Sequence, residues 1–173
     1  MKIKFICLAL LAAVLSSGCK VSSYSWRSTV PENMRIIAVP TFENESGFPE
    51  LGSVVTRCIL REVQREGTFR VGDLDSCKVK LIGKLIKPEM YGLSYNRNYS
   101  SRTSEYRYRL TAEIMLVEKE SGKILIDGKK VSVSTTFLTR DDMLTGMRDA
   151  YPRVGVDLAR KIMDEIQNCW QGE

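Results

Sequence analysis

A long alternation of apolar and polar residues, over residues 105–119, constrains the fold of this 173-residue chain more than any other feature. Successive side chains of a β-strand point to opposite faces, so an alternation of period two predicts a strand with one buried face. The polar face would carry Arg107 and Arg109, and the buried face would carry Tyr106, Tyr108, Leu110, Ala112, Ile114 and Leu116. A turn at Ser121 and Gly122 then returns residues 123–136 as a hairpin partner, in which Gly128 indicates a bulge.

Two more strands are predicted earlier in the chain. Residues 35–39 are a short apolar run that ends at Pro40, and they predict the first strand. Residues 69–87 predict the second, with a break at Gly72 and Asp73 and a stop at Pro88. Residues 89–103 are polar and rich in Tyr and Asn, so we expect them to form a connection.

Two apolar stripes of helical period predict two helices. The first helix starts after Pro49 and ends at Gly67, and its stripe is Leu51, Val54, Val55, Cys58, Ile59 and Val63. The second starts near Pro152 and continues to Trp170. The order β-α-β-β-β-α predicts an α+β fold, in which a four-stranded, mostly antiparallel sheet has both helices packed on one face. The second face of that sheet would then have no helix to cover it.

The first 18 residues have the pattern of an export signal. Lys2 and Lys4 precede an apolar run over residues 5–15, which is shorter than the roughly 20 residues of a membrane-spanning helix. Small residues then lead directly to Cys19, and this ending resembles the cleavage site of bacterial lipoproteins, although Ser16 replaces the usual leucine. We therefore expect a signal peptide over residues 1–18, acyl chains on Cys19, a tether over residues 19–33 and one domain over residues 34–171. An ordinary secreted protein is the alternative.

The composition argues against several classes of function. The chain contains no histidine, which is the commonest general base near neutral pH, and it has no recognisable nucleophile motif or phosphate-binding glycine loop. The adjacent acids Asp141 and Asp142 are expected to introduce a turn. The formal net charge of +5 comes with no basic run interleaved with aromatics, so nucleic acid is not expected as a partner. We expect no enzyme, no cofactor and no metal site.

Three cysteines remain once Cys7 is removed with the signal and Cys19 is acylated. If the strands alternate in direction, Cys77 and Cys169 lie at the same end of the domain, and an oxidising compartment permits a bridge between them. We therefore predict a Cys77–Cys169 disulfide with Cys58 buried as a small apolar residue. The alternative is that all three thiols are free and buried.

Several segments together resemble the lipopolysaccharide-assembly lipoprotein family LptE. The first is the strand and loop over residues 35–46, RIIAVPTFENES, and a helix with an internal Thr56 follows it. The others are the strand start over residues 69–73, FRVGD, the hairpin over residues 121–125, SGKIL, and the final helix, which begins AYPRVGVDLA at Ala150.

This resemblance implies a non-enzymatic role beside the outer-membrane barrel LptD. Such a lipoprotein plugs the barrel, helps it to fold and helps to deliver lipopolysaccharide, so the expected location is the periplasmic side of the outer membrane. Lipopolysaccharide carries phosphates and acidic sugars, which Lys and Arg would bind. The candidate binding residues are on the open sheet face and in the connection that follows: Lys80, Lys84, Arg97, Arg102, Arg107 and Arg109. The alternative function is another envelope lipoprotein, such as a peptidoglycan-synthase activator or a secretion-pore subunit.

Overall fold

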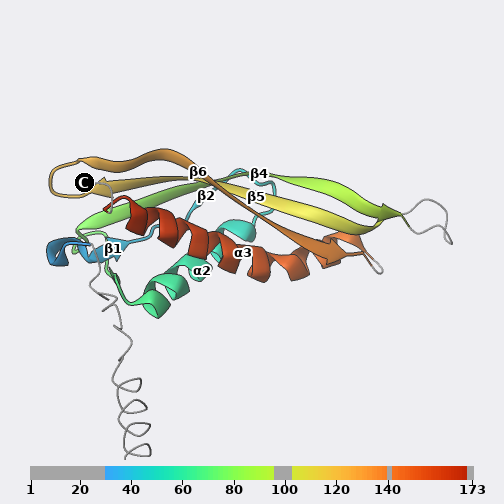
Figure 1. The fold of residues 1–173 in the computed structure, drawn as a ribbon, viewed down its shortest axis with the longest axis horizontal. Coiled ribbons are helices and arrows are strands. Elements are labelled where there is room, and N and C mark those ends of the chain that lie inside the picture. Colours follow the sequence, from blue (N-terminus) through green and yellow to red (C-terminus); the bar gives the residue numbers. More distant parts are fainter. Residues whose placement is uncertain (1–29, 96–102, 140–141, 171–173) are drawn as a thin grey trace, which may run out of the picture.

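The computed structural model describes residues 30–95, 103–139 and 142–170 (Figure 1). A 3-10 helix, η1, and the first strand come at the start of this part of the chain. The elements in order are η1 (Glu32–Met34), β1 (Ile36–Ala38), β2 (Glu43–Asn44), α2 (Leu51–Glu66), β3 (Arg70–Val71), β4 (Val79–Tyr95), β5 (Thr103–Glu118), β6 (Ile124–Leu138) and α3 (Met143–Asn168).

The predicted α+β class is confirmed, and both helices lie on the same side of the sheet (Figure 1). The strand order is β3-β1-β4-β5-β6, and β2 also pairs with β4. The strands β4, β5 and β6 are antiparallel, whereas β1, β2 and β3 pair in parallel. The sheet is therefore mixed and has six strands where four were predicted, because the predicted loop contains β2 and the break at Gly72 separates β3 from β4.

The predicted stop at Pro88 is wrong, since β4 continues to Tyr95. Pro88 lies in a bulge of the strand, which is seen as a shift in the pairing register with β5 between Ile86 and Glu89. Proline lacks an N–H group and is tolerated at bulges and at sheet edges. Beyond Leu85 the described part of β4 pairs only with β5, so Pro88 lies on an edge.

The first helix agrees with its prediction, and the second does not. Gly67 ends α2 in the left-handed region at φ 75°, with its N–H bonded to the Val63 carbonyl. The last helix starts at Met143, well before the predicted start near Pro152, which instead lies inside it. Asp142 caps its N-terminus by accepting a hydrogen bond from the Thr145 N–H at 3.0 Å.

The predicted bulge at Gly128 is confirmed, because residues 127 and 128 stand opposite a single residue of β5.

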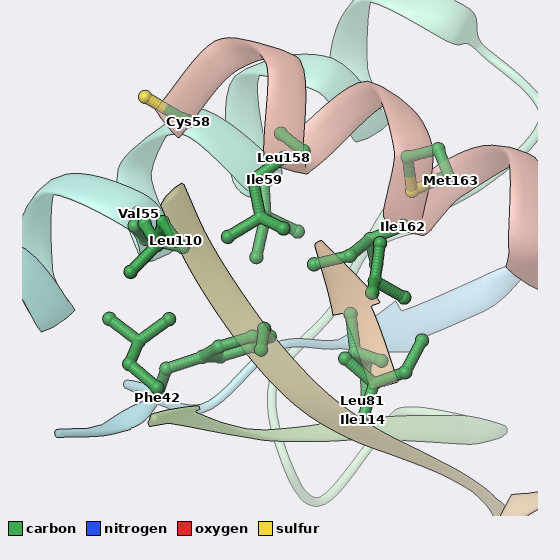
Figure 2. Close-up of a cluster of buried hydrophobic side chains, with 14 of the residues drawn as sticks. Phe42, Val55, Cys58, Ile59, Leu81, Leu110, Ile114, Leu158, Ile162 and Met163 are labelled. Carbon is green, nitrogen blue, oxygen red and sulfur yellow. The ribbon is translucent and has the colours of Figure 1, made fainter. Parts of the chain in front are cut away.

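The hydrophobic core lies between the sheet and the two helices (Figure 2). Residues from α2, α3, β4 and β5 point into it, including Ile59, Ile162, Leu81 and Ile114, all of which are at most 1% exposed. The helices approach closely where Gly155 meets Cys58, because a Cβ on Gly155 would lie 3.1 Å from the Cys58 sulfur. Burial raises the pKa of the Cys58 thiol, in keeping with its predicted apolar role. Val30 is also buried, so the core includes a residue of the predicted tether.

The loop between β1 and α2 is held by side chains of the motif over residues 35–46. Asn44 donates through Nδ2 to the Phe48 carbonyl at 2.8 Å and accepts the Ser46 N–H at 3.1 Å. The Phe42 N–H donates to Thr56 Oγ1 at 3.0 Å, and the Thr56 hydroxyl donates to the Gly52 carbonyl. These contacts tie the loop to the first turns of α2, so the polar residues of the motif act in folding.

In the part of the chain that the structure describes, no helix is both long enough and apolar enough to cross a membrane.

Two glutamates of α2 lie in opposite electrostatic settings. Glu62 accepts a hydrogen bond from Arg65 Nε at 3.0 Å, and this bond lowers the pKa of the Glu62 carboxyl. Burial raises the pKa of Glu66, whose Oε2 is buried without a hydrogen-bond partner in the described structure. The other Glu66 oxygen accepts a hydrogen bond from Gln167 Nε2 of α3. The two carboxyls should therefore contribute to stability with opposite dependence on pH.

Replacing Thr56 with valine should destabilise the protein by about 1–3 kcal/mol, because the buried Phe42 N–H loses its acceptor at nearly constant side-chain volume. Urea unfolding followed by circular dichroism measures this change. The control is Ser53→Ala, which removes an exposed hydroxyl of the same helix and should change the free energy of unfolding by less than about 0.5 kcal/mol. Equal effects of the two changes would contradict the account of the loop.

Glu66→Gln and Glu62→Gln should change the free energy of unfolding with opposite pH trends. The folded state holds the Glu66 proton more tightly than the unfolded state, so the wild type loses stability as pH rises above the ordinary value of 4.5. The free energy of unfolding of Glu66→Gln, relative to that of the wild type, should therefore increase as pH rises. Glu62 contributes stability that is present above its unfolded pKa and lost as pH falls. The free energy of unfolding of Glu62→Gln, relative to that of the wild type, should therefore decrease as pH rises. Urea unfolding at about pH 4 and pH 7 distinguishes the two trends, and parallel trends would refute this assignment.

Candidate binding face

Neither helix covers the outer surface of β4 and β5, which we call the open face (Figure 1). Lys80 and Lys84 of β4 alternate there with the buried Leu81 and Leu85, and Arg107 and Arg109 of β5 alternate with the buried Tyr108 and Leu110. The outward residues that define the open face are Lys80, Ile82, Lys84, Ile86, Glu89, Tyr91, Arg107, Arg109, Thr111, Glu113, Met115 and Val117. Four of the predicted binding residues therefore share one face.

These four cations do not converge on one point. Lys80 stands opposite Val117, whereas Arg107 stands opposite Tyr91, ten residues away along β5. At 3.3 Å per residue, this separation is about 33 Å. The open face therefore has two ends, a proximal end at Lys80 and a distal end at Arg107, and no compact ligand could touch both.

Carboxylates on the same surface neutralise two of the four cations. Lys84 Nζ lies 2.6 Å from Glu45 Oε1, and this hydrogen bond raises the pKa of Lys84. Arg109 Nη1 lies 3.3 Å from Glu89 Oε2. Among the described residues, Lys80 and Arg107 form no ion pair. These two are the cations that an anionic ligand would meet without displacing a carboxylate.

The distal end carries a cluster of Glu89, Tyr91, Arg107 and Arg109, which we call the distal cluster. The Tyr91 hydroxyl donates to Glu89 Oε2 at 2.7 Å, and the Arg109 guanidinium carbon lies 5.9 Å from the Tyr91 ring centroid. The hydrogen bond to Glu89 raises the pKa of Tyr91. Arg107 pairs with Tyr91 across the two strands. The cluster thus combines two guanidinium groups with an exposed aromatic ring and a phenol, a combination suited to phosphate or carboxylate.

Sequence reasoning missed Glu89 and Tyr91 because the strand was expected to end at Pro88. The available signal was the alternation that resumes after the proline, where Glu89, Tyr91 and Leu93 point outward. The bulge at Pro88 shifts the phase of the alternation. The outward positions after Pro88 therefore cannot be found by extending the pattern that precedes it.

The proximal end of the open face is more apolar. A cleft of about 380 Å³ lies between the loop before β4 and the β5–β6 turn, and Leu74, Ile82 and Val117 line it together with Lys80 and Lys119. Lys119 Nζ donates to the Leu74 and Asp75 carbonyls, both at 2.6 Å, and so ties that loop to the end of β5. Apolar surface and cations therefore occur side by side on this face.

Three predicted residues lie outside the described part of the chain. Cys19 belongs to the N-terminal segment, and Arg97 and Arg102 belong to the segment that joins Tyr95 to Thr103. That segment connects β4 to β5 at the distal end, beside Arg107 in the chain.

The predicted Cys77–Cys169 bridge is not formed in the structure, where Cys77 is a free cysteine. The Cys77 sulfur lies 3.3 Å from the Leu74 carbonyl oxygen, and the Cys169 sulfur lies 3.0 Å from that of Ile166. Each sulfur thus contacts the backbone of its own segment. Cys58 is buried at the crossing of the two helices, as predicted.

Comparison with known families gives one match. The family model LptE, described as lipopolysaccharide-assembly, matches residues 34–166, which cover all the strands and most of α3. A search of curated protein sequences found no match.

Solved structures with the same fold come from several bacteria. Protein XCC0632 of Xanthomonas campestris is 9% identical with a TM-score of 0.55, over 82% of this chain and 91% of that one. Uncharacterized lipoprotein B of Nitrosomonas europaea is 11% identical with a TM-score of 0.55, over 85% and 90% of the two chains. The hypothetical protein CT253 of Chlamydia trachomatis is 7% identical with a TM-score of 0.54, over 80% and 98%. At such identities these likenesses concern the fold alone.

Glu89→Gln should lower the pKa of Tyr91 toward its ordinary value of 10.0, because the hydrogen bond to a carboxylate favours the neutral phenol. Nuclear magnetic resonance titration of ¹³C-labelled tyrosine measures this pKa. The free energy of unfolding should change by less than about 1 kcal/mol, since the ion pair is exposed. An unchanged Tyr91 pKa would show that the cluster is not formed in solution.

Proposed function

The chain belongs to the LptE family of lipopolysaccharide-assembly proteins, and on this basis we propose that it partners an LptD-type barrel and binds lipopolysaccharide on its open face. The observation that carries the proposal is the family match. It covers the core-forming residues of both helices and every strand in the described part of the chain. The family is non-enzymatic and acts in lipopolysaccharide transport at the outer membrane. The proposed role is therefore that of a plug and assembly factor.

Acylation of Cys19 would hold the domain on the periplasmic side of the outer membrane. Two or more acyl chains give stable anchoring, whereas one gives only marginal binding. The described structure begins at Val30, so 11 residues, from Cys19 through residue 29, separate the anchor from the core. At full extension they span about 36–40 Å, which keeps the domain close to the leaflet.

The distal cluster is the preferred place for the acidic groups of lipopolysaccharide. Arg107 is exposed and has no carboxylate partner among the described residues, whereas Arg109 forms an ion pair with Glu89. Arg97 and Arg102 lie in the adjoining connection, so the chain itself brings further guanidinium groups to this end. The apolar residues of the proximal end suit an amphiphile better than a simple anion.

The role as a barrel partner is tested by purifying the tagged, lipidated protein from detergent-solubilised outer membrane. Recovery of one large barrel per lipoprotein, identified by mass spectrometry, is the expected result. A ring made of this chain alone would instead indicate a secretion-pore subunit, and a retained cell-wall synthase would indicate an activator. Either of these outcomes without a barrel overturns the proposal.

Arg107→Ala should weaken the binding of lipopolysaccharide by about 10- to 100-fold, because a hydrogen bond to a charged group contributes about 1.5–3 kcal/mol. Titration of fluorescently labelled lipopolysaccharide measures the affinity, and added salt should reduce the difference by screening. The matched control is Arg57→Ala, which removes an exposed arginine from α2 on the other side of the molecule. Equal losses for the two variants would count against the open face.

A further inference from the structure

The proximal end of the open face exposes large apolar side chains to solvent. Leu74 of the loop before β4 is 52% exposed, and Ile82 of β4 is 41% exposed. Ile124, the first residue of β6, is 50% exposed and stands opposite Val117 of β5, and Met115 stands opposite Ile82. Because paired residues of neighbouring strands point to the same face, these side chains form one surface, which we call the proximal apolar patch.

The proximal apolar patch is hollowed by the cleft of about 380 Å³, which Leu74, Ile82 and Val117 line. Lys119 holds the loop that forms one wall of this cleft, through its two hydrogen bonds to the Leu74 and Asp75 carbonyls. An apolar cleft that is open to solvent commonly marks a binding site for an apolar group.

Ammonium groups border the apolar walls of the cleft. Lys80 and Lys119 line it, together with the carboxylate of Glu118. Glu118 accepts a hydrogen bond from the Ser121 hydroxyl, and Lys80 has no carboxylate partner among the described residues. Lysine side chains lay their methylene stems along apolar surface and keep the ammonium group at its border. The cleft therefore combines apolar walls with a cationic rim, which matches an acyl chain that carries an anionic headgroup.

The same end of the domain receives the tether. The described chain begins at Val30, directly before η1, and η1, the start of β4 and the β5–β6 turn lie together at one end of the molecule (Figure 1). A small pocket is shared by η1, Lys78 and Glu118, and Glu118 also lines the cleft. The proximal apolar patch is thus the part of the open face nearest to the segment that leads to Cys19.

The two ends of the open face suit different chemical classes. The distal cluster is about 33 Å away along the strands, so acidic groups held there leave the cleft unfilled. A second copy of this chain is a poor match for the proximal apolar patch, because a two-fold contact would bring Lys80 and Lys119 of both copies together. A surface of phospholipids offers what the patch lacks, namely an apolar layer below a layer of phosphates.

We propose that the proximal apolar patch docks onto the phospholipid leaflet that holds the anchor, with its apolar side chains entering the apolar layer and Lys80 meeting lipid phosphates. The cleft then receives an acyl chain of that leaflet. The affinity of such a contact grows with the apolar area buried and with the attraction to anionic lipids. This inference rests on the proposed function only for the anchor, and it assigns to the proximal end a lipid that the domain does not transport.

The test measures how the full mature chain binds vesicles without its anchor. Cys19→Ser removes the acylation site, and sedimentation with vesicles of phosphatidylethanolamine and phosphatidylglycerol in equal parts gives the partition coefficient of this parent chain. Ile82→Asp and Leu74→Asp each remove an apolar side chain from the patch. Leu93→Asp and Leu144→Asp are the matched controls, since Leu93 is an outward residue of β4 with 42% exposure and Leu144 has the same 52% exposure as Leu74. Thermal unfolding checks that each variant folds.

Ile82→Asp and Leu74→Asp should each lower the partition coefficient by about tenfold, and the two controls should leave it within about twofold of the parent chain. Lys80→Gln should lower the partition coefficient by about fivefold on these vesicles. On vesicles of phosphatidylcholine alone, Lys80→Gln should change it by less than about twofold, because the attraction requires anionic lipid.

Equal losses for the patch variants and the controls, or no binding by the parent chain, would overturn the proposal. A dimer in analytical ultracentrifugation that Ile82→Asp disrupts would also overturn it, because the occupant would then be a second copy. The vesicles contain neither barrel nor lipopolysaccharide, so vesicle binding without recovery of a barrel would contradict the proposed function and support this inference. Recovery of the barrel without vesicle binding would do the reverse.

Discussion

Burial of one face of β4, β5 and β6 under α2 and α3 is the constraint on which the rest of the structure depends. Each helix has a single apolar stripe, so each has only one surface that must be removed from water. Both stripes meet the same sheet face, where Leu81, Leu110 and Ile162 are fully buried. The opposite face then carries no packing requirement, and its side chains are available for binding.

The polar motif residues of the β1–α2 loop belong to the scaffold. Asn44 and Thr56 bond to backbone groups within that loop and within α2, and they lie apart from the distal cluster. The resemblance to the LptE family therefore rests on residues that build the fold. The proposed binding residues lie on a surface that these motif residues do not form, so family membership supports the role without locating the site.

The period-two alternation of the strands and the apolar stripes of the helices were sufficient to predict α2, the β5–β6 hairpin, the one-sided placement of the helices and the open face. They were insufficient where tertiary contacts override a local signal. Pro88 signals a stop, but a bulge at an unpaired edge accommodates it. Asp142 was expected to make a turn, and its carboxylate caps a helix that then continues through Pro152. Residues 43 and 44 form a strand only because β4 lies beside them. The same limits hid Glu89 and Tyr91, and no pattern in the sequence revealed that Lys80 and Arg107 are about 33 Å apart.

The most direct measurement of the central claim is arginine footprinting with a guanidinium-specific reagent on the detergent-purified membrane complex and on the isolated domain. Arg107 and Arg109 lie on the open face, and Arg57 and Arg61 are exposed on α2. The account predicts that complex formation protects the first pair and leaves the second pair equally reactive. Protection of Arg57 and Arg61, with Arg107 and Arg109 unchanged, would contradict it and would place the partner on the helical layer.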